Sequence, residues 1–116
     1  MKYYTEIVPF EVAKKLKDAG FPQYHNKGPW YNTFKELRLF SVCGDAVQAP
    51  TYAKAFDWLI EKGIAVEMER TFKEWCAFLC PIEPDTMGSS IFHGPTFHKA
   101  ANAAIEKACE ILKGNG

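Results

Sequence analysis

The chain contains four cysteines and three histidines, and two of each fall within one short stretch. In residues 76–98, CAFLCPIEPDTMGSSIFHGPTFH, the candidate ligands are Cys76, Cys80, His93 and His98. Three, twelve and four residues separate them, which satisfies the C-x2–4-C-x12-H-x3–5-H formula of zinc fingers that bind nucleic acid. The stretch therefore raises the hypothesis of a zinc-dependent nucleic-acid-binding domain built on these four residues.

Local geometry argues against that zinc site. The apolar run WCAFLCPI predicts a strand, in which the α-carbons of Cys76 and Cys80 lie roughly 13 Å apart. Two sulfurs on one zinc must lie within roughly 4 Å of each other, and a disulfide needs α-carbons roughly 4.4–6.8 Å apart. A glycine-proline pair also separates His93 from the predicted last helix, which contains His98. We therefore interpret both cysteines as buried, reduced thiols and predict neither a metal nor a cofactor.

Length and composition predict a single domain over residues 1–116. The chain is 47% apolar, which is enough for a core without disulfides or metals. Its 14 basic residues balance 14 acidic ones, and this disfavours nucleic-acid binding, which depends on Lys and Arg contacts to phosphate. No stretch approaches the roughly 20 apolar residues that cross a bilayer, and no export signal is recognisable. We expect a cytoplasmic protein without membrane contact, in which Cys43 and Cys109 are also reduced.

Hydrophobic periodicity predicts an α+β fold. Apolar residues at helical spacing, with threonine caps and terminal glycines, predict three helices. After Gly63, apolar and polar residues alternate, which predicts the first strand. Ile60 belongs to the expected buried stripe of the second helix, and Gly114 is expected to end the third. The predicted elements are helices within 8–21 and 49–64, strands at 64–70, 75–82 and 89–93, and a helix that follows Thr96.

These elements predict a small antiparallel sheet of two or three strands covered by about three helices, in the order α-α-β-β-(β)-α. Residues 22–48 show no clear period. Because a structureless loop of that length is uncommon in a compact domain, we expect at least one short strand or helical turn there.

Aromatic residues gather in FPQYHNKGPWYNTF, within the segment that lacks a clear period. Rings with polar tips suit recognition surfaces, although the same rings could instead cover the core. Because no short catalytic signature is present, we name no catalytic residue and lean against an enzyme, while an enzyme of unidentified type stays open. The leading hypothesis is a small non-enzymatic binding protein whose partner is another protein or a second copy in a homodimer. Its candidate binding residues are Tyr24, His25, Trp30, Tyr31 and Phe34.

Four pieces of the chain resemble a group of small uncharacterised proteins of gut anaerobic bacteria and their phages and mobile elements. The likeness lies in PFEVAKKLKDAGFPQ, APTYAKAFDWLIEKGIAVEM, Trp75 and TFHKAANAAIEKACEIL, and leaves out residues 22–48. The resemblance implies an α+β domain of prophage or mobile-element origin with no assigned activity. Paired cysteines at the positions of Cys76 and Cys80 are not a feature of that group, which puts any site built on this pair in doubt.

Overall fold

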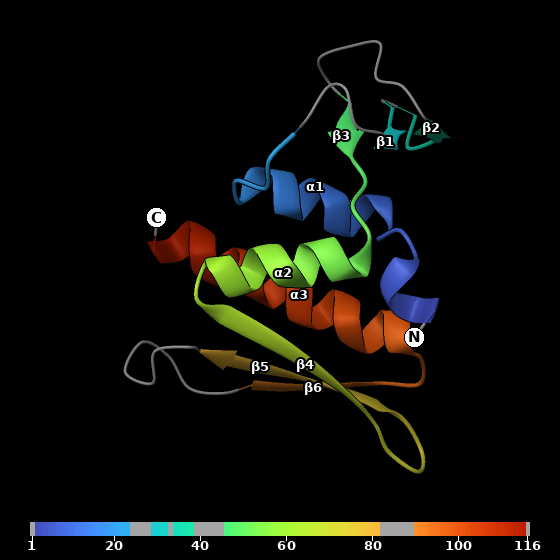
Figure 1. The fold of residues 1–116 in the computed structure, drawn as a ribbon, viewed down its shortest axis with the longest axis vertical. Coiled ribbons are helices and arrows are strands. Elements are labelled where there is room, and N and C mark those ends of the chain that lie inside the picture. Colours follow the sequence, from blue (N-terminus) through green and yellow to red (C-terminus); the bar gives the residue numbers. More distant parts are fainter. Residues whose placement is uncertain (1, 24–28, 33, 39–45, 82–89, 116) are drawn as a thin grey trace.

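The computed structural model describes residues 2–23, 29–32, 34–38, 46–81 and 90–115. It contains three α-helices, one short 3-10 helix (η1, Lys2–Thr5) and two three-stranded antiparallel sheets. The two sheets lie toward opposite ends of the long axis, with the three α-helices between them (Figure 1). The α+β class predicted from the sequence is therefore confirmed.

Helix α1 (Phe10–Asp18) ends in the way its sequence predicts. Gly20 adopts a φ of 108°, a left-handed conformation that favours glycine. Its amide donates to the carbonyl of Lys17, and the amide of Phe21 donates to the carbonyl of Leu16. These two bonds form the Schellman motif, which satisfies carbonyls that the helix end leaves free.

Helix α2 (Tyr52–Glu61) begins and ends at the predicted signals. The hydroxyl of Thr51 accepts a hydrogen bond from the amide of Lys54, and Gly63 has a φ of 92° just beyond the helix. The prediction that Ile60 belongs to the buried stripe is wrong, because its side chain is 47% exposed. Periodicity marks the apolar side of a helix but does not show how much of that side the neighbouring elements cover.

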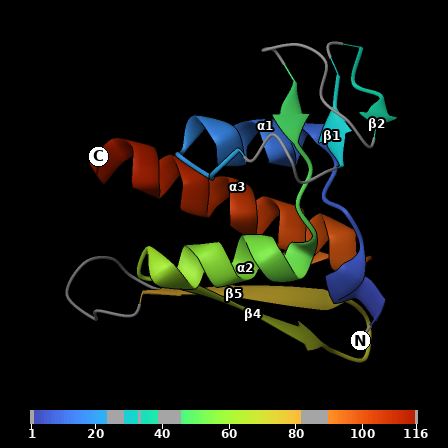
Figure 2. The same cartoon turned by 45° about the horizontal axis from the view of Figure 1, so that its top comes forward.

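Helix α3 (Phe97–Asn115) is the longest element and packs against both α1 and the large sheet (Figure 2). The hydroxyl of Thr96 accepts a hydrogen bond from the amide of Lys99, as the predicted cap requires. The prediction that Gly114 ends this helix is wrong, because the helix continues to Asn115. Unlike Gly20, Gly114 does not adopt the positive φ that turns a chain out of a helix.

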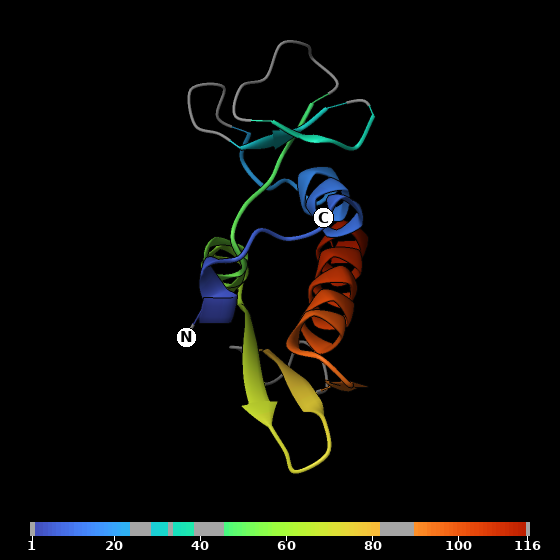
Figure 3. The same cartoon turned by 90° about the vertical axis from the view of Figure 1, so that its right-hand side faces the viewer.

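The large sheet consists of β4 (Ile64–Arg70), β5 (Trp75–Pro81) and β6 (Ser90–Gly94), with β5 in the centre. Helices α2 and α3 pack on one face of this sheet. Figure 3 shows both helices on that side and no described element on the other. The sheet residues that β5 turns toward the helices are buried, namely Trp75, Ala77 and Leu79.

The small sheet consists of three two-residue strands, β1 (Trp30–Tyr31), β2 (Leu37–Arg38) and β3 (Val47–Gln48), with β1 in the centre. The expectation of a short strand within residues 22–48 is confirmed, but a second sheet was not predicted. Two residues are too few to show the alternation by which a strand is recognised in a sequence. This sheet packs next to α1 through β3.

Candidate functional site

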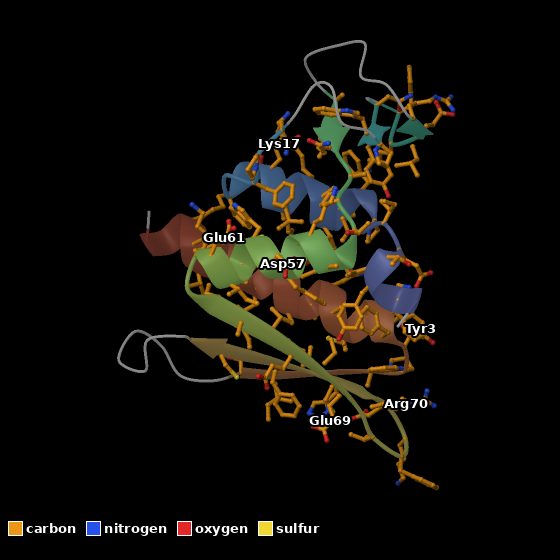
Figure 4. The ribbon with its side chains drawn as sticks, in the orientation of Figure 1. Tyr3, Lys17, Asp57, Glu61, Glu69 and Arg70 are labelled. Carbon is orange, nitrogen blue, oxygen red and sulfur yellow. The ribbon has the colours of Figure 1, made fainter. Side chains whose placement is uncertain are left out.

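Strand register brings three polar residues together on the open face of the large sheet. On the central strand, Cys76 pairs directly with Glu69 of β4 and with His93 of β6. Directly paired residues project to the same face of a sheet, so their side chains are neighbours. Figure 4 shows Glu69 on the side of the sheet turned away from the helices.

Three side chains converge there, and we call Glu74, Cys76 and His93 the 74–76–93 cluster. The Nδ1 atom of His93 lies 2.6 Å from a carboxylate oxygen of Glu74 and 3.3 Å from the sulfur of Cys76. Their potential ligand atoms all lie within 4.8 Å of one another. Cys76 is only 5% exposed, whereas the side chain of His93 is 56% exposed. The thiol therefore forms the floor of the cluster, and the imidazole and carboxylate form its accessible rim.

The turn between β4 and β5 fixes the position of Glu74. The Thr71 hydroxyl accepts a hydrogen bond from the Glu74 amide at 3.1 Å and donates to the Glu74 carbonyl at 2.8 Å. The Thr71 amide donates to the same carbonyl at 2.8 Å. Three local hydrogen bonds thus hold the backbone of Glu74 beside the start of the central strand, where its side chain meets the imidazole of His93.

The surroundings of Cys76 do not favour nucleophilic chemistry. Burial raises the pKa of its thiol, and the carboxylates of Glu74 and Glu69 raise it further. A reactive cysteine needs the opposite, a pKa lowered by neighbouring positive charge. In addition, Cys76 and Glu74 both meet the Nδ1 atom of His93, whereas in a catalytic triad the nucleophile and the carboxylate contact different ring nitrogens. The cluster is therefore poorly arranged for covalent catalysis.

The structure brings together two of the four residues in the zinc-finger formula and separates the other two. Cys80 lies four residues farther along the same strand, where it pairs with Ala65. It is half-buried, so the prediction that both cysteines are buried is confirmed for Cys76 and wrong for Cys80. His98 lies on α3, and its Nε2 atom is 3.1 Å from a carboxylate oxygen of Glu6. Within the described ranges, no second group of three or more potential ligand side chains comes as close as the 74–76–93 cluster.

The formula missed Glu74, because it considers only cysteines and histidines. The sequence predicted that the strand through Cys76 is followed by a strand through His93, but the register that places the thiol and the imidazole opposite each other comes from the structure.

The candidate residues of the aromatic binding hypothesis lie in different environments. Tyr24 and His25 lie outside the described residues. Trp30 is 2% exposed, which places it in the interior rather than on an accessible surface. Tyr31 is half-buried, and its hydroxyl donates a 2.7 Å hydrogen bond to the carbonyl of Val8, while burial raises the pKa of the phenol. The Tyr31 side chain thus helps to hold the small sheet in place.

Phe34 has a different environment, because its side chain is 80% exposed. It lies in the loop between β1 and β2, which Asn32 closes from both its side chain and its backbone. The Asn32 side-chain oxygen accepts hydrogen bonds from the amides of Phe34 and Glu36 at 2.9 and 3.0 Å. The Asn32 carbonyl accepts from the amide of Lys35, and the Asn32 amide donates to the carbonyl of Glu36, both at 2.9 Å. Four hydrogen bonds therefore define the backbone that presents this ring.

The same loop is also attached to helix α1. The ammonium group of Lys35 lies 3.4 Å from a carboxylate oxygen of Glu11 and 5.2 Å from the ring centroid of Phe10. The Phe10 ring in turn makes an edge-to-face contact with Tyr31, with centroids 5.7 Å apart. These contacts orient the hairpin relative to the body of the protein, so the direction in which it projects is defined.

A third feature is a crevice between α1 and α3. Lys15 and Glu106 form a 3.0 Å ion pair across it, which raises the pKa of the Lys15 ammonium. Cys109 lies beneath this pair and is 1% exposed, and burial raises the pKa of its thiol to about 12. The crevice therefore combines a self-neutralised ion pair with a thiol that stays protonated, and neither group is available for catalysis or for holding a charged ligand.

Comparison with known proteins adds no relative. No protein-family model, no curated protein and no solved structure matches this chain. None of the helices in the described ranges is long and apolar enough to cross a membrane. The phage or mobile-element origin implied by the sequence resemblance stays a prediction.

Proposed function

We propose that this protein is a non-enzymatic binding protein that inserts Phe34 into an apolar pocket of another protein. The observation that supports this is the pairing of an 80% exposed phenylalanine with the 45% exposed Leu37 on one hairpin whose loop is closed by four hydrogen bonds. Exposure alone does not single out Phe34, because Phe72 is 97% exposed. Aromatic side chains are enriched at protein interfaces and supply much of the buried area. A ring whose own amide and whose neighbours' amides are already hydrogen-bonded loses less conformational entropy on binding, which improves affinity.

The backbone of the loop supports the same conclusion. Lys35 has a φ of 65°, a left-handed conformation that costs an L-residue with a side chain roughly 1–2 kcal/mol. Such conformations cluster at ligand clamps and other functional loops. Here the conformation shapes the loop so that Phe34 points outward while Lys35 contacts Glu11. The backbone at Lys35 is therefore held in a conformation of higher energy than the right-handed one.

The charges around Phe34 favour a protein pocket over nucleic acid. Lys35 pairs with Glu11 at 3.4 Å, and Arg38 pairs with Glu36 at 3.2 Å. The two described cations of the β1–β2 hairpin are therefore balanced by carboxylates, whereas binding to a phosphate backbone depends on unbalanced positive charge. Leu37 is 45% exposed on the same hairpin and enlarges the apolar area that a partner can cover.

Site-specific photocrosslinking tests this proposal. Benzoylphenylalanine is introduced at position 34 in cells that naturally produce the protein, and the control carries it at position 72. Phe72 is a matched control, because it is 97% exposed and follows β4 of the large sheet, at the other end of the molecule from the β1–β2 hairpin (Figure 1). We expect position 34, and not position 72, to crosslink to one defined protein. Equal labelling from both positions would contradict the proposal.

Binding measurements with the purified partner give the second test. The Phe34→Ala variant should bind it at least about tenfold more weakly, a loss of about 1.4 kcal/mol, while the Phe72→Ala variant binds normally. Neither substitution should change the free energy of unfolding by more than about 0.5 kcal/mol, because both rings are on the surface. If position 34 crosslinks to a second copy of the chain, the partner is that copy and the protein forms a homodimer, which native mass spectrometry would detect.

A further inference from the structure

We infer that Glu74, Cys76 and His93 together bind a divalent transition-metal ion, with Zn²⁺ as the best fit, on the open face of the large sheet. This site is independent of the proposed role of Phe34, because that residue lies on the hairpin of the small sheet at the opposite end of the molecule (Figure 1). The inference rests on the positions of three donor atoms of different kinds and on the charges around them.

The distances suit a small metal ion. Zinc bonds of about 2.0–2.3 Å in tetrahedral geometry place ligand atoms roughly 3.3–3.7 Å apart. The sulfur of Cys76 already lies 3.3 Å from the Nδ1 atom of His93. The 2.6 Å separation between that nitrogen and the Glu74 carboxylate must widen by less than about 1 Å to meet the same geometry. The side chains of His93 and Glu74 are 56% and 38% exposed, so they have room for this adjustment.

The donor set selects the class of metal. One thiolate, one imidazole and one carboxylate suit Zn²⁺ and neighbouring transition metals, whereas Mg²⁺ and Ca²⁺ prefer oxygen ligands only. The local charge points the same way. The carboxylates of Glu74 and Glu69 disfavour a free thiolate at Cys76, and for the same reason they favour a cation placed beside that sulfur.

The protons can be accounted for. In the free protein, the Nδ1 atom of His93 can donate its proton to Glu74, and Cys76 carries a thiol proton. Metal binding moves the imidazole proton to the exposed Nε2 atom, and the thiol proton leaves to solvent as the metal–sulfur bond forms. Each ion bound therefore releases one proton. The ionisable groups that face this position are Glu69 on β4, Glu74 in the turn and His93 on β6.

The site has three protein ligands, which leaves one tetrahedral position for a further donor. Glu69 is the nearest candidate, because it pairs directly with Cys76 across the sheet and its side chain lies on the same face. A water molecule is the alternative occupant. In either case, the metal would lie on the accessible face of the sheet and not between the sheet and the helices.

Metal titration of the untagged protein tests the inference. We expect one Zn²⁺ or Co²⁺ ion per chain, and a sulfur-to-cobalt charge-transfer band that the Cys76→Ser variant lacks. Loss of a group that only hydrogen-bonds to a metal ligand typically weakens metal binding ~10–100-fold. Because each substitution removes a ligand itself, we expect a larger loss of Zn²⁺ affinity in the variants Cys76→Ser, His93→Gln and Glu74→Gln. His93 and Glu74 are accessible, so their variants remain informative if the buried Cys76→Ser variant folds poorly.

The chain supplies matched controls. Cys80 lies on the same strand as Cys76, and His98 is a histidine paired with a glutamate outside the cluster. The Cys80→Ser and His98→Gln variants should retain the metal with unchanged affinity. Loss of the metal in these two variants would overturn the inference in favour of the zinc-finger quartet. Absence of stoichiometric binding, or binding unaffected by Cys76→Ser and His93→Gln, would also overturn it. The Phe34→Ala variant should bind the metal normally, so this test and that of the proposed function fail separately.

Discussion

The two sheets of this protein have the same number of strands but are stabilised differently. The strands of the large sheet are five to seven residues long, and helices α2 and α3 cover one face of it. The strands of the small sheet are two residues long, and β2 is exposed at both positions. The large sheet therefore gains its stability mainly from apolar burial, whereas in the small sheet burial is confined to Trp30 and the two residues of β3.

Individual polar contacts add to this burial in the small sheet. The Tyr31 hydroxyl binds the Val8 carbonyl, and the amide of Gln48 donates to the side-chain oxygen of Gln23 at 2.7 Å. The ion pair between Lys35 and Glu11 adds an exposed contact. Loss of one large apolar side chain should therefore destabilise the large sheet more than the small sheet, whereas loss of one hydroxyl should affect the small sheet more.

The sharpest test compares the same substitution in both sheets. Leu79 on β5 is fully buried, and Leu37 on β2 is 45% exposed. We expect Leu79→Ala to lower the free energy of unfolding by about 2–5 kcal/mol, because it leaves a cavity. Leu37→Ala should change it by no more than about 0.5 kcal/mol. Urea unfolding measures both, and similar losses in the two variants would remove the distinction between the sheets.

A second test concerns the closeness of the large sheet to its covering helix. A Cβ atom on Gly94 of β6 would lie 2.9 Å from the backbone nitrogen of Ala100 in α3. Gly94→Ala should therefore destabilise the protein by about 1–3 kcal/mol through overpacking. The control is Gly114→Ala, where no atom lies within 4 Å and the higher helix propensity of alanine should add up to about 1 kcal/mol. Tolerance of Gly94→Ala would mean that α3 can move away from the sheet.

The interior between α1 and α3 should also respond to alkaline pH. In the unfolded chain the thiol of Cys109 loses its proton near pH 9, but in the folded protein burial raises its pKa to about 12. Between these values the unfolded state binds fewer protons, so stability falls as the pH rises. One unit above the ordinary value, at pH 10, the loss is about 1.4 kcal/mol. The Cys109→Ala variant should show a smaller fall between pH 8 and pH 10, and an identical fall would contradict the assignment.

The hydroxyl of Tyr31 provides the corresponding test in the small sheet. Tyr31→Phe removes its 2.7 Å hydrogen bond to the Val8 carbonyl, which should cost about 1 kcal/mol. Hydrogen exchange should locate the effect. We expect faster exchange of the amides in the small sheet and unchanged exchange in β4 and β5. Uniform acceleration in both sheets would show that they open as one unit.

The smallest expected effect is a gain in stability. Lys35 adopts the left-handed conformation at a φ of 65°, and glycine adopts it without the steric penalty. Lys35→Gly also loses an exposed ion pair with Glu11, which contributes little. We expect a net gain of about 0.5 kcal/mol in the free energy of unfolding. A clear loss would show that the contacts of the lysine with helix α1 outweigh the relief of strain.

Local signals predicted the body of the fold because they act over a few residues. Gly20 and Gly63 end helices through their positive φ, and Thr51 and Thr96 cap helices through bonds to amides three residues later. Each of these signals lies entirely within a short piece of sequence. The small sheet has no such signal, because its strands are two residues long and its two outer strands pair with β1 across intervening chain.

The candidate site was predictable only in part for a related reason. Residue type and spacing singled out Cys76 and His93, which the structure brings together. The same formula also named Cys80 and His98, which lie elsewhere, since a linear spacing carries no information about strand register. The exposure of Phe34 and the burial of Trp30 were equally hidden, because both depend on how the small sheet docks against α1.

Strand β4 is an edge strand of the large sheet, which has a consequence for the behaviour of concentrated protein. Within the described ranges no strand pairs with its outer side, so its free backbone groups could join a strand of another molecule. Glu67 and Glu69 are exposed on this strand. When two copies approach edge to edge, these carboxylates repel one another and oppose the stacking that leads to fibrils. The acidic face of β4 thus also acts as a gatekeeper that favours solubility over aggregation.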